Sequence, residues 1–134
     1  MAGKNGSFVS VDDRRQHPRF EERNRVTVTV LSAPDVPQIE SRSYYCWTRD
    51  LSAGGMRFCV HSRVPVGAIL KLEVMFDEPQ EVFRHIGKVM WEQEFNDDGI
   101  SSNWLGVQIT ETLGGEARFT VWKLCVENIM NAVH

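Results

Sequence analysis

Apolar and polar residues alternate through most of this chain, and this alternation limits its fold more than any other property. The clearest case is the segment Arg25-Val-Thr-Val-Thr-Val-Leu31. Side chains of an extended strand point alternately to its two faces, so β-branched residues at a period of two predict a strand with one buried face. Residues 56–60, 68–76 and 104–110 show the same alternation, and the short aromatic segment 43–49 and the segment 81–92 are also expected to be strands.

Short turn-forming segments separate these strands. Pro65 and Gly67 mark one break, and Asn96-Asp-Asp-Gly99 marks another. The segment from Asp50 to Gly55 joins the second and third strands, which predicts a hairpin. Six short strands without intervening helices predict an all-β antiparallel domain, either a barrel or a sandwich.

The end of the chain has a different period. From about Gly115 to Ala132, apolar residues recur at helical spacing and cover much of the girth. We therefore expect an all-β domain with a C-terminal helix, divided into strands at 25–112 and a helix at 113–133. One side of this helix is expected to cover the strands, and the other is a candidate surface for a homodimer.

Length and composition indicate one domain. The 134 residues are 42% hydrophobic, which is enough for a packed core. No uncharged apolar run approaches the roughly 18 residues that a spanning helix needs, and the segment Met1 to Gly6 lacks the apolar stretch of a secretion signal. We expect a cytoplasmic protein without membrane insertion. Residues 1–12 are small and polar, which predicts a flexible leader.

Charge argues against a nucleic acid polymer as partner. The net charge is -3, so the chain has no overall attraction to polyanions. Between Asp12 and Arg25 lie five arginines and four acids, too balanced for a polybasic tail that acts by counterion release. These arginines make better sense as ligands of one particular anion. A small barrel that binds single-stranded nucleic acid is the alternative that this charge disfavours.

Cysteine, histidine and serine residues give no sign of a metal or catalytic site. Three cysteines contain no CxxC pair, and four histidines lack HxxxH spacing. Ser52 has no GxSxG surroundings that would make it a nucleophile. We therefore expect no metal, no cofactor and no enzymatic activity.

Two short motifs together carry groups that suit one ligand. Arg15-Gln-His-Pro-Arg19 holds two guanidiniums in a segment that Pro18 biases toward extended geometry. Arginine forks bind phosphate oxygens and guanine O6 and N7. Asp50-Leu-Ser-Ala-Gly-Gly55 adds a carboxylate that can accept from guanine N–H groups, a hydroxyl and a flexible turn. Each motif alone also has an ordinary explanation, as a solvated charge pair or as hairpin chemistry with glycines at positive φ.

The order of the motifs is more specific than either motif. RxxxR lies just before the first strand and DxSxxG lies between the second and third, and in this the chain resembles the PilZ family of bacterial cyclic di-GMP receptors. The resemblance implies a PilZ-like domain over residues 13–134. It further implies a six-stranded antiparallel β-barrel with a trailing helix, preceded by an arginine-motif arm at residues 13–24.

The resemblance also implies roles for single residues. Arg15 and Arg19 are expected to wrap the ligand and bind its phosphates and guanine. Asp50 and Ser52 are expected to contact a guanine base, and Gly55 is expected to let the backbone approach the ligand closely.

Three further ligand-binding candidates follow. Arg14 is similar to the residue found in family members that hold two intercalated cyclic di-GMP molecules per protomer, so we expect two. Gly54 occupies a free position of the motif, and its role is inferred from turn flexibility. Trp91, near the end of the fifth strand, offers a flat face for stacking a guanine; alternatively, it is a core aromatic at the end of the barrel.

These residues together predict a second-messenger receptor. It would bind cyclic di-GMP, order its arginine arm on binding and so signal to a downstream protein partner, which the sequence does not identify. The alternative is a PilZ-like adaptor that binds only protein and has no nucleotide ligand.

Overall fold

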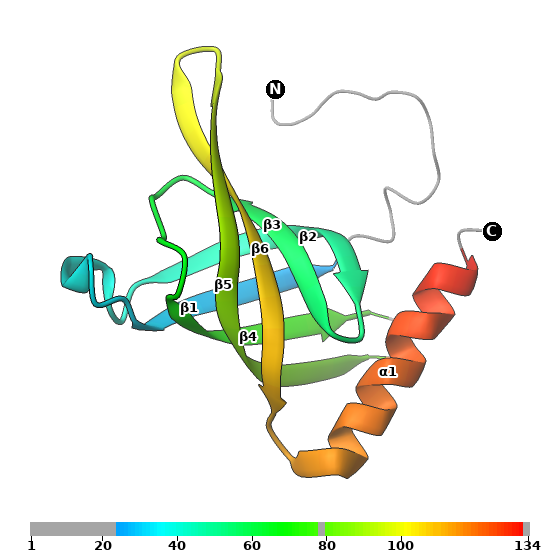
Figure 1. Cartoon of the computed structure of the whole chain (residues 1–134). Helices are drawn as coiled ribbons and strands as arrows, with labels where there is room; N and C mark the ends of the chain where they lie inside the picture. Colours follow the sequence, from blue (N-terminus) through cyan, green and yellow to red (C-terminus); the bar gives the residue numbers. More distant parts are fainter. Residues whose placement is uncertain (1–23, 78–79, 133–134) are drawn as a thin grey trace.

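The computed structural model describes residues 24–77 and 80–132. Arg14, Arg15 and Arg19 lie outside the described residues, as do the predicted leader and nearly all of the predicted arm. The described part consists of strands, a short 3-10 helix and one C-terminal helix (Figure 1). These elements are β1 (Arg25–Ser32), η3 (Pro37–Ile39), β2 (Ser43–Ser52), β3 (Gly55–Val60), β4 (Ile69–Phe76), β5 (Glu81–Asp97), β6 (Ile100–Thr112) and α1 (Gly115–Ala132).

The strands close into a barrel. Their order around it is β1-β2-β3-β6-β5-β4, and each neighbouring pair is antiparallel. Closure pairs every strand on both sides and so removes the exposed edges that an open sheet would carry. The predicted six-stranded antiparallel barrel with a C-terminal helix is thus confirmed, and the sandwich alternative is wrong.

Apolar side chains at every second strand position fill the inside of the barrel. Every second residue is buried from Val26 to Val30 in β1 and throughout β4, including Val28, Leu70 and Leu72. Burying an aliphatic side chain of this size contributes roughly 1.5 to 3 kcal/mol relative to leaving it exposed. The alternation noted in the sequence is therefore the pattern of the core.

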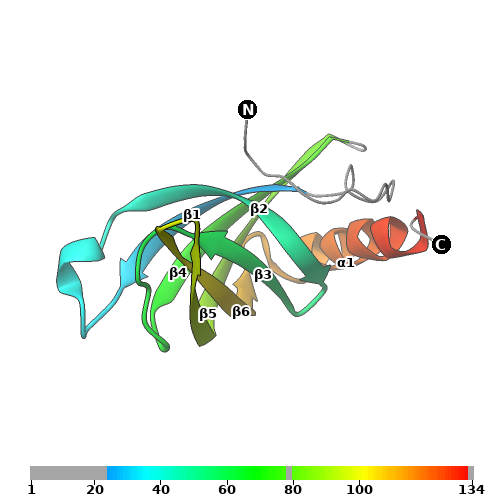
Figure 2. The same ribbon diagram turned by 90° about the horizontal axis from the view of Figure 1, so that it is seen from above.

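The helix α1 lies at one end of the barrel, and β5 and β6 continue beyond the other end as a long hairpin (Figures 1 and 2). From α1, Trp122 enters the core completely and packs against Phe76 and Phe83, with ring centroids 5.8 and 5.4 Å away. One face of the helix thus covers the barrel, as expected. On the other side Leu124 is exposed, and a homodimer through this helix stays a prediction.

Candidate ligand-binding groove

Four strands bring a single row of residues together on the outside of the barrel. In the strand register, Asp50 of β2 lies opposite Arg57 of β3, Arg57 lies opposite Gly106 of β6, and Gly106 lies opposite Trp91 of β5. Residues that are distant in the chain therefore become lateral neighbours. The row starts at the acid of the DxSxxG motif and ends at the tryptophan that was singled out from the sequence.

Two β-bulges turn this row outward. The register of β2 shifts between Thr48 and Asp50, so that Arg49 and Asp50 both point outside while Thr48 stays buried. The register of β5 shifts in the same way next to Trp91, and both Met90 and Trp91 are exposed. A bulge inserts one residue and changes which face the following side chains occupy. Asp50 is accordingly a residue of β2 itself, two positions before the strand ends.

A groove of about 480 Å³ lies over the row. Its lining includes every DxSxxG candidate and Trp91, together with Arg57, Gly106 and Gln108. The structure thus brings together Asp50, Ser52, Gly54, Gly55 and Trp91.

Arg57 is a residue of this groove that the sequence analysis did not identify. Its Nη2 atom lies 2.6 Å from Oδ2 of Asp50, with the side chains 44% and 69% exposed. Its guanidinium lies over the ring of Trp104, 5.2 Å from the centroid. Its Nε is buried without a hydrogen-bond partner. Hairpin pairing outward from the turn was the available signal, because it places residue 57 opposite residue 50 before the bulge at Arg49 is reached.

Trp91 lies against the backbone of Gly106. A Cβ atom at position 106 would collide with the indole ring, so only glycine leaves room for the ring there. The side chain of Trp91 is 41% exposed and lines the groove. The interpretation of Trp91 as a core aromatic is therefore wrong, because the bulge before it directs the ring outward.

The hairpin turn at the end of the groove is held by β6. A Cβ atom at Gly55 would lie 2.6 Å from the carbonyl oxygen of Val107, so the close approach of β3 to β6 requires glycine. The backbone N–H of Ile109 donates to the carbonyl oxygen of Gly54, at 2.8 Å, and Ser52 Oγ donates to the carbonyl oxygen of Gly55, at 3.2 Å. Neither Gly54 nor Gly55 has a positive φ. Their expected role in supplying positive φ is therefore wrong.

The helix holds the same turn from inside the molecule. Trp122 Nε1 donates to the carbonyl oxygen of Ala53, at 3.0 Å. The ring of Trp122 packs edge to face on His85, with centroids 4.3 Å apart. His85 is fully buried, with Nδ1 3.0 Å from Thr112 Oγ1 and Nε2 without a partner. Burial, and to a smaller extent the charge of Arg118, lower the pKa of His85 to about 4, so this imidazole is neutral at physiological pH.

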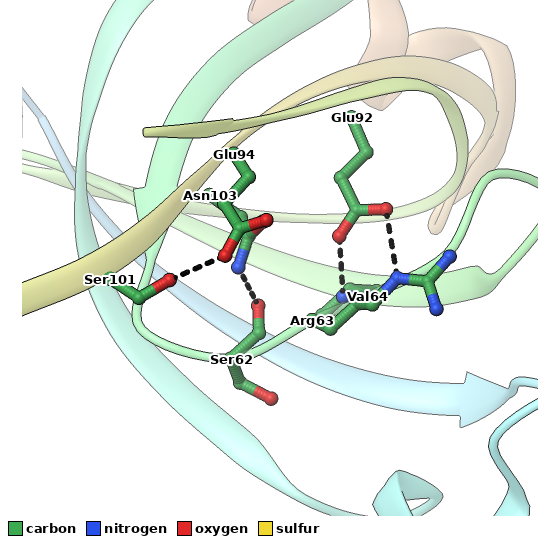
Figure 3. A network of polar contacts seen from close by, with 7 residues as sticks. All are labelled: Ser62, Arg63, Val64, Glu92, Glu94, Ser101 and Asn103. Atoms are coloured by element: carbon green, nitrogen blue, oxygen red, sulfur yellow. Dashed lines mark hydrogen bonds and ion pairs between the residues drawn. The ribbon is translucent and has the colours of Figure 1, made fainter. Parts of the chain in front are cut away.

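A second hollow, of about 360 Å³, lies at the base of the β5–β6 extension (Figure 3). Its acidic groups are bonded to the protein itself. Glu92 accepts from the backbone N–H of Val64 at 3.2 Å and pairs with Nε of Arg63 at 3.5 Å. Glu94 accepts from Ser101 Oγ at 2.7 Å. The contacts of Glu92 join the base of the hairpin to the loop after β3, and the bond of Glu94 joins β5 to β6.

Residues 24–77 and 80–132 contain no group of three or more histidine, cysteine, aspartate or glutamate side chains placed to hold a metal ion. Over the same ranges, no helix combines the length and the apolar character that crossing a membrane requires.

Comparison with known proteins identifies the fold. A family model of the PilZ domain matches residues 13–122, a range that includes both motifs and all six strands. No curated protein matches the chain by sequence.

Three solved structures are similar to this barrel. The PilZ domain of YcgR from Escherichia coli, solved with c-di-GMP, is 15% identical, with a TM-score of 0.55 over 81% of this chain and 83% of that chain. MrkH from K. pneumoniae, in its apo state, is 18% identical, with a TM-score of 0.58 over 91% of this chain and 55% of that chain.

The third structure is the inhibitor of motility MotI (DgrA) from Bacillus subtilis. It is 14% identical, with a TM-score of 0.56 over 90% of this chain and 53% of that chain. This chain spans just over half the length of MrkH and of MotI. At these identities the likeness shows a shared fold, and the family model shows the family. The chain therefore belongs to the PilZ domain family, the family of cyclic di-GMP receptors and adaptors.

Proposed function

We propose that this protein is a receptor for cyclic di-GMP. The observation that carries the proposal is the lining of the groove. Asp50, Ser52 and Gly55 of the second motif line it together with the exposed ring of Trp91. Membership of the PilZ family supports the same ligand, as does the similarity to a YcgR domain that was solved with it.

The chemistry of the groove suits a guanine base. The carboxylate of Asp50 can accept from guanine N–H groups, and the hydroxyl of Ser52 adds a second polar contact. The indole of Trp91 offers a face for stacking, which contributes roughly 1 to 3 kcal/mol per base in other proteins. Because Gly54 and Gly55 carry no side chains, a ligand can approach the backbone of the turn closely.

In this proposal, the arginines of the first motif supply the cationic groups that bind the phosphates of a dianionic ligand. In the proposed mechanism, Arg15 and Arg19 bind the phosphates and a guanine edge through forked, charge-assisted hydrogen bonds. Ordering the arm against the groove costs conformational entropy, which these bonds offset. The ordered arm then presents a changed surface to a protein partner.

Arg14 extends the proposal to stoichiometry. An arginine directly before the motif is expected to accompany two intercalated ligands, so two cyclic di-GMP molecules should bind per protomer.

The competing function is a PilZ-like adaptor that binds protein and no nucleotide. A direct binding measurement separates the two.

Calorimetric titration with cyclic di-GMP tests the proposal. The wild-type protein should bind the ligand and saturate at about two molecules per chain. Arg15→Ala or Arg19→Ala should abolish binding and leave the thermal transition of the free protein nearly unchanged. Arg15→Lys should also fail, because an ammonium lacks the planar fork. Arg63→Ala, in the second hollow, removes the same charge and should bind like wild type.

Each outcome has a defined meaning. Wild-type affinity in the Arg15 and Arg19 variants would refute the motif assignment. Saturation at one ligand per chain would refute the role of Arg14. A wild-type protein that binds no cyclic di-GMP would favour the adaptor function.

A further inference from the structure

We propose that Arg57 reads the guanine base together with Asp50 and sets the preference of the groove for guanine over adenine. This inference rests on the proposed function, since it concerns how the same groove selects its ligand. Arg57 belongs to neither sequence motif, and it lies two residues beyond the last glycine of the second.

The first support is the geometry of the pair. Asp50 and Arg57 are directly opposite each other in adjacent strands, and both line the groove. Their contact joins Nη2 to Oδ2 at 2.6 Å. It engages one oxygen of the carboxylate and one nitrogen of the guanidinium, so acceptor and donor capacity remains on both side chains. A hydrogen-bond acceptor and a hydrogen-bond donor therefore stand side by side in the groove.

The second support is an unmet donor. Arg57 Nε is buried and has no hydrogen-bond partner, although the guanidinium itself borders the groove. Buried polar groups in proteins are nearly always paired, so an orphaned donor calls for an explanation. As placed, Nε is closed to the groove, so a bound base bonds to the exposed part of the guanidinium, and Nε gains a partner only when the side chain shifts toward the base.

The pair matches guanine and opposes adenine. On the pairing edge of guanine, the O6 acceptor stands next to the N1–H and N2–H donors, so O6 can accept from Arg57 while N1–H donates to Asp50. Adenine has an amino donor where guanine has O6, and an acceptor nitrogen where guanine has N1–H. In the same position, the amino donor of adenine would face the donors of Arg57, and its acceptor nitrogen would face the carboxylate of Asp50. These polar groups would then be covered by the base and left without partners.

The third support is the platform under Arg57. Its guanidinium lies 5.2 Å from the ring centroid of Trp104, and Phe95 stacks on the same ring at 5.8 Å. A cation over an aromatic face is attracted to it. The guanidinium is thereby positioned before the ligand arrives, which lowers the entropic cost of ordering it on binding.

Arg49 provides a matched control. It lies over the same Trp104 ring, 5.4 Å from the centroid, and carries the same charge. Arg49 is not among the residues that line the groove. Removing it changes the charge and the ring contact as the Arg57 variant does, without touching the pair with Asp50.

The test compares two ligands that share the phosphate ring. Cyclic di-GMP and cyclic di-AMP are titrated into the full chain, and the ratio of the two affinities is measured. The wild-type protein should prefer cyclic di-GMP. Arg57→Ala should lower that ratio by about 10-fold. Arg57→Lys should also lower it, because a lysine lacks the bidentate fork. Arg49→Ala should keep the wild-type ratio within about twofold.

The outcomes separate this inference from the proposed function. An Arg57→Ala protein that loses affinity for both ligands equally keeps its ratio, and this result would overturn base reading in favour of a general electrostatic or structural role. If Arg57→Ala does not fold, the Arg57→Lys variant decides by the same ratio. A wild-type protein that binds neither dinucleotide would overturn both proposals, whereas tight wild-type binding with unchanged ratios in the variants would overturn this one alone.

Discussion

The groove over β2, β3, β6 and β5 and the hollow at the base of the β5–β6 extension have similar volumes, about 480 and 360 Å³. They differ in what their polar groups do. In the hollow, Glu92 and Glu94 are bonded to their own chain (Figure 3). In the groove, Asp50 and Arg57 pair with each other through one atom each, but Arg57 keeps a buried unpaired Nε and Asp50 is 69% exposed. Polar groups that are already paired hold elements together, and groups with remaining capacity can bind a ligand. Volume alone would not have separated the two.

The two regions also differ in what lies behind them. The turn of the groove is tied to Trp122, which packs on the buried His85. The second hollow contains a different histidine, His61, whose Nδ1 lies 2.8 Å from Ser102 Oγ at its margin. The groove and the second hollow therefore differ both in the polar groups at their surface and in the residues behind them. Three predictions test this difference.

The largest expected effect concerns His85 and stability. Its pKa is about 4 in the folded protein and 6.5 ordinarily. Between these values the unfolded chain takes up a proton that the folded chain does not, so stability is complete above pH 6.5 and falls as the pH drops towards 4. The loss from this residue should reach about 3 kcal/mol. Chemical denaturation at pH 7 and at pH 5 measures its onset.

A histidine variant isolates this contribution. His85→Leu should show a weaker pH dependence of stability over the same window. Identical pH profiles for wild type and His85→Leu would contradict the assignment of a neutral buried imidazole behind the groove.

The next effect concerns ligand affinity. Asp50→Ala should weaken cyclic di-GMP binding by about 10- to 150-fold, because a hydrogen bond to a charged group contributes about 1.5 to 3 kcal/mol. Glu94→Ala removes a carboxylate from the second hollow and should leave affinity within about twofold. Titration calorimetry on both variants checks this. Equal losses in the two would mean that the groove and the hollow do not differ as receptors of this ligand.

The smallest effect concerns the bond behind the turn. Trp122→Phe removes the donor to Ala53 and some ring volume, which should lower the free energy of unfolding by about 1 to 2 kcal/mol. Tyr44→Phe is the counterpart near the second hollow, since it removes a hydroxyl that donates to Ser62 Oγ at 3.0 Å. It should cost less, because both partners stay closer to solvent. Denaturant titrations of the two variants give the comparison, and a larger loss in Tyr44→Phe would contradict it.

The local pattern of this sequence was sufficient for much of the fold. Alternating valines specify the strands because side chains point to opposite faces of an extended backbone. Gly115 to Ala132 form the helix expected from their periodicity, and the order of the two motifs indicated the family that the PilZ family model matches. These signals lie within short segments, or within their order along the chain, and so need no knowledge of tertiary contacts.

The composition of the groove was decided by tertiary structure. Asp50 and Trp91 lie on the outside of the barrel, although Thr48 and Val89 two positions earlier are buried, only because one bulge in β2 and another in β5 shift the register. A bulge has no reliable sequence signature, since it forms where packing of the closed barrel favours one extra residue over a regular ladder. A shift of one residue moves a side chain to the other face of a strand. For this physical reason the alternation along β2 and β5 alone could not place Asp50 and Trp91 outside the core.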